Sequence, residues 1–136
     1  MATLRDLDAL ALAMPDTVRA SLGDDRFEYV VGGKKSLCRH REERKDAIDP
    51  DTGERMRDVL MFRTPSLEAR DVLLETHPEI FFITDHFAGY PAALTRIPRL
   101  AALSRDDLDD IVVEAWLAVA PKRAAKAWLA EQDAAD

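Results

Sequence analysis

The chain has 136 residues, of which 47% are hydrophobic and 33% are charged, and its formal net charge is −7. This length and composition indicate one folded domain and exclude a disordered chain. A single cysteine excludes a disulfide framework and a thiolate zinc site, and no apolar run approaches the roughly 20 residues of a membrane-spanning helix. Acids interrupt the apolar start of the chain, which argues against a secretory signal peptide, so we expect a cytoplasmic protein.

The chain begins with a predicted helix. Over residues 4–14 the apolar side chains recur at the spacing of one helical face, and Thr3 is placed to cap this helix. Pro15 ends the pattern. Residues 16–25 are expected to add at most one further helical turn, closed by Gly23.

Three strands are predicted next. Apolar and polar residues alternate over 26–31, and the glycine pair that follows suits a tight hairpin turn because glycine accepts positive φ. Residues 35–41 form the predicted returning strand. A charged segment, residues 42–56, contains a Pro-Asp-Thr-Gly turn and leads into the third strand, residues 57–63.

The second half of the chain predicts two helices and two short strands. A helix over 66–77, capped by Ser66, is expected to bury the face that carries Ala69, Val72, Leu73 and Thr76. Strands are predicted over 80–84 and 92–97, joined by a connection rich in turn residues.

The strongest helical pattern lies over 104–120, and Ser104 is placed to cap this helix in a capping-box pattern with Asp107. Trp116 falls in register with its apolar stripe and is expected to be buried. Pro121 is expected to kink the helix or to restart it, and Lys122, Arg123 and Lys126 follow as cations suited to a helix C-terminus.

The predicted element order is α-β-β-β-α-β-β-α. Because the strands come mostly in hairpins, we expect an α+β fold with two layers, in which helices pack on a largely antiparallel five-stranded sheet. Residues 1–130 are expected to form a single domain, and residues 131–136 a polar C-terminal tail.

Three stretches carry a resemblance to a known family. They are residues 27–34 (FEYVVGGK), 80–96, which include DHFAGYP and LTR, and 104–123, which end in APKR. On these stretches the chain resembles the MmcQ/YjbR-like family of small bacterial proteins, from about Leu4 to Leu129. The resemblance implies a two-layer α+β fold akin to type III secretion chaperones, no catalytic signature, and the label DNA-binding that the family commonly carries.

The densest basic segment is the candidate nucleic-acid surface. Between residues 34 and 45 it holds Lys34, Lys35, Arg39, Arg41, Arg44 and Lys45. Lysine and arginine pair with phosphate, and a two-stranded ribbon fits a major groove. The alternative is a solvated hairpin whose cations are balanced by nearby acids.

An aromatic region between residues 80 and 96 is the candidate surface for a ligand or partner. Its named members are His86, Phe87, Tyr90 and Arg96. Apolar area with a few polar tips is typical of a binding pocket, although the same residues also suit the edge of a core.

Patterns for catalysis and metal binding are weak. Cys38 and His40 share one face of a strand about 7 Å apart, which is too far for the hydrogen bond that activates a nucleophile. The DPDTGE turn has the acids of a calcium-binding loop, but its twelfth position is Leu60 instead of glutamate. His40, His77 and His86 lack ligand spacing, and His77 suits the end of a helix. We expect no enzymatic activity, no cofactor and no metal.

Three function classes remain from the sequence, and an enzyme ranks third because no acid–base or nucleophile arrangement is visible. The family label favours a DNA-binding protein, and the chaperone-like fold favours an adaptor that binds a protein or peptide. If DNA is bound, residues 34–45 must carry the contacts, because this segment has a charge of +4 and the rest of the chain −11. Such binding should be weak and strongly dependent on salt.

Overall fold

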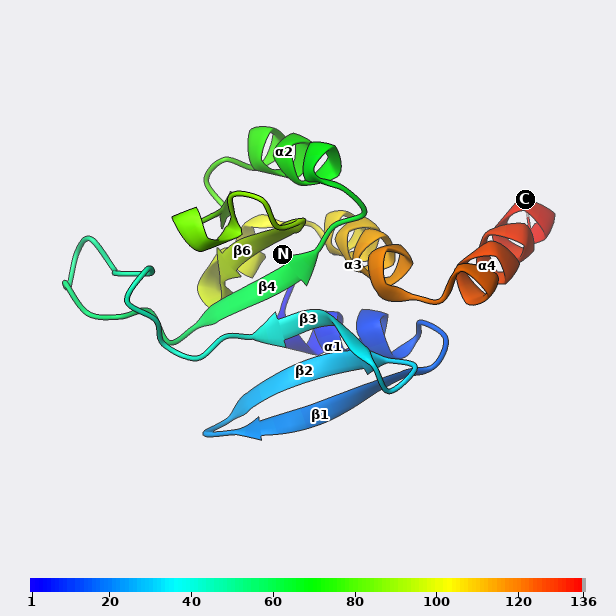
Figure 1. Ribbon diagram of the computed structural model, residues 1–136, viewed down its shortest axis with the longest axis horizontal. Coiled ribbons are helices and arrows are strands. Elements are labelled where there is room, and N and C mark those ends of the chain that lie inside the picture. Colours follow the sequence, from blue (N-terminus) through cyan, green and yellow to red (C-terminus); the bar gives the residue numbers. More distant parts are fainter. Residues whose placement is uncertain (136) are drawn as a thin grey trace.

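The computed structural model describes residues 1–135 of the chain. Six strands form one sheet in the order β1-β2-β3-β4-β6-β5, and every neighbouring pair is antiparallel (Figure 1). The predicted α+β fold, with helices packed on an antiparallel sheet, is confirmed. In chain order, the helices and strands are α1 (Leu4–Leu12), β1 (Thr17–Gly23), β2 (Arg26–Val31), β3 (Lys35–His40), β4 (Val59–Arg63), α2 (Leu67–Thr76), β5 (Phe81–Phe82), β6 (Ala92–Arg96), α3 (Arg105–Val119) and α4 (Lys122–Ala135).

The sheet has a strand that the sequence did not predict. Residues expected to hold one helical turn form β1, which pairs with β2, so the sheet has six strands and not five. The two strands are joined by Asp24 and Asp25, whose φ angles of 51° and 64° are those of a type I′ hairpin turn. Aspartate tolerates this left-handed backbone less readily than glycine or asparagine, so the turn signal is weak. Because β1 is an edge strand and mostly exposed, it also lacks the alternation of a half-buried strand.

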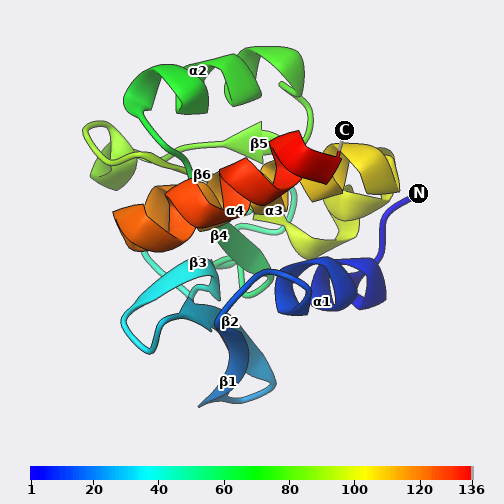
Figure 2. The same ribbon diagram turned by 90° about the vertical axis from the view of Figure 1, so that its right-hand side faces the viewer.

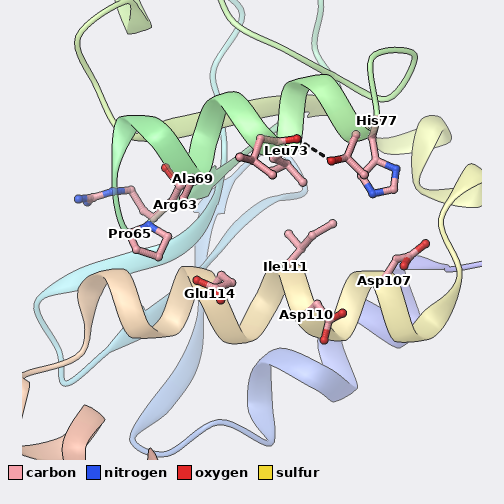
Figure 3. Close-up of a pocket in the computed structure, with 12 residues that line it drawn as sticks. Arg63, Pro65, Ala69, Leu73, His77, Asp107, Asp110, Ile111 and Glu114 are labelled. Carbon is pink, nitrogen blue, oxygen red and sulfur yellow. Dashed lines mark hydrogen bonds between the residues drawn. The ribbon is translucent and has the colours of Figure 1, made fainter.

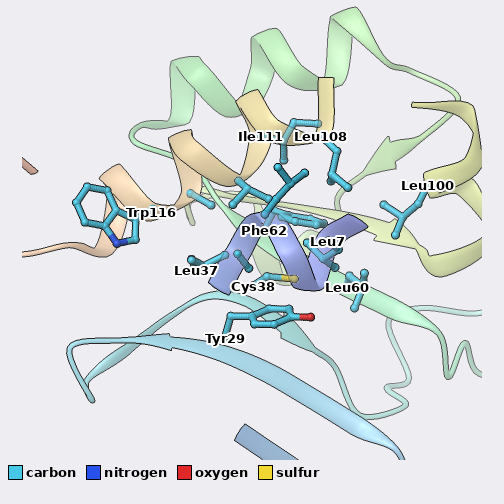
Figure 4. Close-up of a cluster of buried hydrophobic side chains, with 14 of the residues drawn as sticks. Leu7, Tyr29, Leu37, Cys38, Leu60, Phe62, Leu100, Leu108, Ile111 and Trp116 are labelled. Carbon is cyan, nitrogen blue, oxygen red and sulfur yellow. The ribbon is translucent and has the colours of Figure 1, made fainter. Parts of the chain in front are cut away.

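The main core lies between the sheet and helices α1 and α3. Its largest fully buried side chains include Trp116, Tyr29 and Phe62, and apolar residues of α1, α3 and the middle strands surround them (Figure 4). Trp116 is only 1% exposed, which confirms its predicted burial. Figure 2 shows α3 lying between α1 and α2 on this side of the molecule.

The opposite face of the sheet is covered by irregular chain. Neighbouring residues on β4 and β6 alternate between the two faces, so Val59 and Leu94 belong to a second, smaller apolar cluster. Phe87, from the connection before β6, completes this cluster together with Ala47 and Met56 from the charged segment. The segment is thereby held against the sheet.

The predicted helix caps are confirmed, but the predicted buried face of α2 is wrong. The hydroxyls of Thr3, Ser66 and Ser104 each accept a hydrogen bond from the backbone N–H three residues later. In α2, however, Val72 is 56% exposed, Thr76 is exposed, and the buried residue is Arg70. Helix α2 packs on β5 and β6 at the edge of the sheet through the partly buried Leu73 and Leu74, so the side that carries Val72 and Thr76 faces solvent.

Pro121 was expected either to kink the last helix or to restart it, and a new helix begins after it. Helix α3 ends at Val119 and α4 begins at Lys122. Residues 131–135, expected as a polar tail, continue α4 as exposed helical residues, and Asp136 lies outside the described residues. The cations of this region therefore stand at the start of a helix and not at its end.

Candidate binding groove and neighbouring surfaces

A groove of about 460 Å³ runs between α2 and α3, and we call it the α2/α3 groove (Figure 3). Its floor is apolar and is made by Ala69, Val72 and Leu73 of α2 and by Ile111 of α3. Since Val72 is largely exposed and Leu73 is partly exposed, this apolar surface faces solvent and is available to a partner.

One wall of the α2/α3 groove is acidic. Asp107, Asp110 and Glu114 recur at i, i+3 and i+7 along α3, so they line one side of that helix (Figure 3). All three are exposed, and within residues 1–135 none of them forms an ion pair. Basic groups lie only toward the ends of α2, where Arg63 and His77 line the groove. The wall therefore offers three free carboxylates to a cationic ligand.

The basic residues predicted to bind DNA are not gathered into one patch. Lys34 and Lys35 lie at the start of β3, whereas Arg44 and Lys45 follow its other end, roughly 20 Å away for a six-residue strand. Arg39 is exposed on β3 and pairs across the sheet with Glu28 of β2.

Arg41 differs from the other five because it is held inside the fold. Its side chain is only 10% exposed, and its guanidinium lies 4.9 Å from the centroid of the Phe87 ring and 3.4 Å from the Asp46 carboxylate. Arg41 thus fixes the charged segment to the connection before β6. Because its guanidinium is engaged by Asp46 and Phe87, this charge is not available to bind DNA.

Three of the four residues predicted as a partner surface lie together. The ring centroid of Phe87 is 5.3 Å from that of His86 and 5.8 Å from that of Tyr90. Phe87 is buried in the second apolar cluster, whereas Tyr90 is 39% exposed and has the Arg63 guanidinium 5.0 Å from its ring centroid. This set is mainly the edge of a core, with His86 and Tyr90 as its exposed tips.

Arg96, the fourth residue, does not join this set. It lies at the other end of β6 and binds two carboxylates, with Nη1 2.6 Å from Asp49 and Nε 2.9 Å from Asp58. The hydrogen bond from Arg96 is the main reason that the pKa of the Asp49 carboxyl lies below its usual value, and the backbone N–H of Asp51 adds to the effect. Arg96 therefore ties the charged segment to the sheet.

This ion pair predicts a specific dependence of stability on pH. The pKa of Asp49 is lower in the folded state than its unfolded value of about 3.9. The contribution of the Asp49 carboxylate to folding stability is therefore complete above the unfolded pKa and is lost as the pH falls through the folded pKa. We expect Asp49→Asn to be less stable than the parent from pH 7 to about pH 4, and the difference to disappear below that range. Urea unfolding between pH 7 and pH 2.5 measures it. Arg57→Gln, which breaks a solvated pair with Glu43, is the control and should change stability little.

Arg70 was not predicted from the sequence; it is buried on α2 and positions the connection before β6. Its Nη1 donates to the backbone carbonyls of Phe87 (2.7 Å), Ala88 (3.1 Å) and Tyr90 (3.2 Å). Its Nε and Nη2 donate to Asp71. The sequence offered one signal for the burial of Arg70. Arg70 precedes the partly buried Leu73 by three residues, so both lie on the same side of the helix.

Cys38 and His40 are both buried, and their contacts are those of residues with a structural role. Burial raises the pKa of the Cys38 thiol far above its usual value, so this sulfur stays protonated and is a poor nucleophile. The Nε2 of His40 lies 2.9 Å from the carbonyl oxygen of Arg57, and its ring packs edge-on against Phe27. Within residues 1–135, no group of three or more histidine, cysteine, aspartate or glutamate side chains could hold a metal ion.

Comparison with known proteins finds relatives that match nearly the whole chain, and the names of these relatives state no activity. No protein-family model matches the chain, and no solved structure matches it. No helix in the described part of the chain is long and apolar enough to cross a membrane.

Three mycobacterial proteins match nearly end to end. "Uncharacterized protein Mb2600" of Mycobacterium bovis is 32% identical over 138 residues, which cover 96% of this chain and 98% of that protein. "Uncharacterized protein MT2646" and "Uncharacterized protein Rv2570" of Mycobacterium tuberculosis match with the same identity and coverage. The chain belongs to the family of these mycobacterial proteins.

Proposed function

We propose that the protein is a cytoplasmic adaptor of the MmcQ/YjbR type that binds a cationic, amphipathic peptide or helix in the α2/α3 groove. The assignment to that type rests on the three resembling stretches of sequence. The observation that carries the binding function is the combination of an exposed apolar floor with a wall of three unpaired carboxylates.

The two parts of the groove have different roles in recognition. Burial of apolar surface on Val72, Leu73 and Ile111 supplies a favourable free energy of binding. This free energy does not require a particular orientation of the bound peptide. The carboxylates along α3 select a positively charged partner and speed its association. Helical ligands that bind in grooves present anchors at i, i+3, i+4 and i+7, and the spacing of the acids on α3 matches such a stripe.

A designed peptide tests this proposal. The probe is a fluorescently labelled helix of about 14 residues with leucines on one face and lysines beside them, titrated by anisotropy at about 50 mM salt. Asp110→Lys should weaken its binding by about three- to tenfold, since reversing one exposed charge changes a surface interaction by about 1 kcal/mol.

The matched control lies one residue away on the same helix. Asp109 is exposed and is not part of the groove, so Asp109→Lys makes the same change in net charge without touching the binding surface. We expect this variant to bind the peptide as the parent does. An equal loss in both variants would indicate attraction by net charge alone and would contradict the groove as the site.

Duplex DNA is the competing ligand. The exposed Lys34, Lys35, Arg39, Arg44 and Lys45 are the residues through which it would bind. If the protein binds duplex DNA at about 50 mM salt, loses it steeply by about 200 mM and ignores the peptide, the DNA-binding function is favoured over the adaptor.

A further inference from the structure

Helix α4 is held to the rest of the molecule by one side only. No residue of α4 is buried, and it packs on the core through Ala124, Ala125 and Trp128, whose ring centroid is 5.8 Å from that of Trp116. The helix extends away from the sheet (Figure 1). Its other side is therefore free to contact a partner.

The free side of α4 is cationic and apolar. Lys122, Lys126 and Leu129 recur at i, i+4 and i+7, so they form one stripe, and Leu129 is 47% exposed. Lys122, Arg123 and Lys126 stand in the first turns of the helix, where the helix dipole disfavours positive charge. Within residues 1–135 none of these three forms an ion pair, and the first turn holds no acid. A nearby anionic surface would relieve this unfavourable charge.

The α2/α3 groove supplies such a surface on the same chain. Its acids recur along α3 at a spacing close to that of the lysines on α4, and its apolar floor can receive Leu129. We propose that α4 of a second copy of this chain occupies the α2/α3 groove, with Lys122 and Lys126 against the acidic wall and Leu129 on the floor. This inference rests on the proposed function, because it names the resident occupant of the same groove.

The α4 helix of the same copy does not reach this groove. Trp116 and Asp107 are nine residues apart on α3, which places them on opposite sides of the helix. Because Trp128 packs on Trp116, α4 is held on the side of α3 that faces away from the acidic wall. The groove is therefore open to a second molecule.

The arrangement closes as a dimer. Each copy offers one helix and one groove, so a twofold axis satisfies both contacts at once and leaves neither groove open. Helix α4 has 14 residues and is thus about 21 Å long, enough to lie along the whole of α2, which has 10 residues. A target peptide must then displace α4, and dimerisation regulates access to the groove.

Sedimentation equilibrium of the full chain tests this proposal. The parent should be a dimer at micromolar concentration, and Leu129→Glu and Lys126→Glu should each weaken the dimer by at least about tenfold. Both side chains are exposed, so circular dichroism should show unchanged helix content. Ala127→Glu, on a different side of α4, is the control and should remain dimeric.

A charge exchange makes the test specific. Asp110→Lys should also weaken the dimer, and the double variant Asp110→Lys with Lys126→Glu should restore it, because the two changes meet across the interface. A dimer that ignores all of these substitutions would use another surface and would overturn the proposal. A chain that is monomeric at every concentration would overturn it as well.

The designed peptide separates this inference from the function on which it rests. If both are right, the Leu129→Glu monomer should bind the peptide more tightly than the parent, because its groove is empty. If the parent is monomeric and binds the peptide, the adaptor function is supported and the α4 contact is overturned. A dimer that depends on Asp110 and Leu129 but never binds the peptide would support the α4 contact and overturn the adaptor function.

Discussion

Replacing Trp116 by alanine should lower the free energy of unfolding by about 3–5 kcal/mol, the range for large aromatic residues in a core. Trp116 is 1% exposed and belongs to the main core, so the change leaves a cavity near the C-terminal end of α3, where the ring packs against Trp128. It also removes a hydrogen bond of 2.9 Å from its Nε1 to the carbonyl oxygen of Pro15, which holds the end of the first helix segment against α3. Urea unfolding followed by circular dichroism measures the loss.

Trp128 provides the comparison for this prediction. It is the same type of residue, but it is half-buried and lies on the edge of the core, so Trp128→Ala should cost clearly less than Trp116→Ala. If the two variants lost equal stability, or if Trp116→Ala unfolded at the urea concentration of the parent, the position of α3 on the sheet would be wrong.

Replacing Arg70 by methionine should lower the free energy of unfolding by about 2–4 kcal/mol, because a charged donor is lost from three carbonyl groups. Methionine has a similar length and fills most of the space, so the loss reports on the hydrogen bonds more than on packing. The connection that contains Phe87 and Tyr90 should loosen first. Faster amide exchange at residues 85–90, together with the urea midpoint, measures both effects.

Arg70→Lys separates charge from geometry. Lysine keeps the positive charge but lacks the planar guanidinium that reaches several acceptors at once, so it should recover only part of the lost stability. Full recovery with lysine would show that charge alone holds the connection. No loss with methionine would show that the three carbonyl groups find other donors.

The sequence predicted those parts of the fold that depend on local interactions. The helix beginnings at Thr3, Ser66 and Ser104 were predicted because a cap involves only neighbouring residues. The register of Trp116 was predicted because α3 carries a long apolar stripe. In contrast, β1 was missed because an edge strand buries neither face and its turn uses two aspartates.

The candidate site depended on contacts between distant segments and was largely missed. The acids of α3 were visible in the sequence, but acids near the start of a helix are explained by its dipole alone. Only the packing of α2 beside α3 brings Leu73 to Ile111 and turns those acids into the wall of a groove. Arg41 and Arg96 were predicted as binding residues because their charge is visible. The acids that neutralise Arg96 are 47 and 38 residues away in the chain, whereas Asp46 is only five residues from Arg41, in line with the alternative of a hairpin balanced by nearby acids.

The exposed edge of β1 bears on the solubility of the protein. An outermost strand leaves one row of backbone N–H and C=O groups without a partner in its own sheet, and such a row can template the growth of fibrils. In β1 the register shifts between Ser21 and Gly23, and Arg19 places a charge in the middle of the strand. An added strand would meet an irregular backbone and a charge that it cannot bury. The β1 edge is thereby protected against pairing with a strand of another copy, even when many copies of the chain are crowded together.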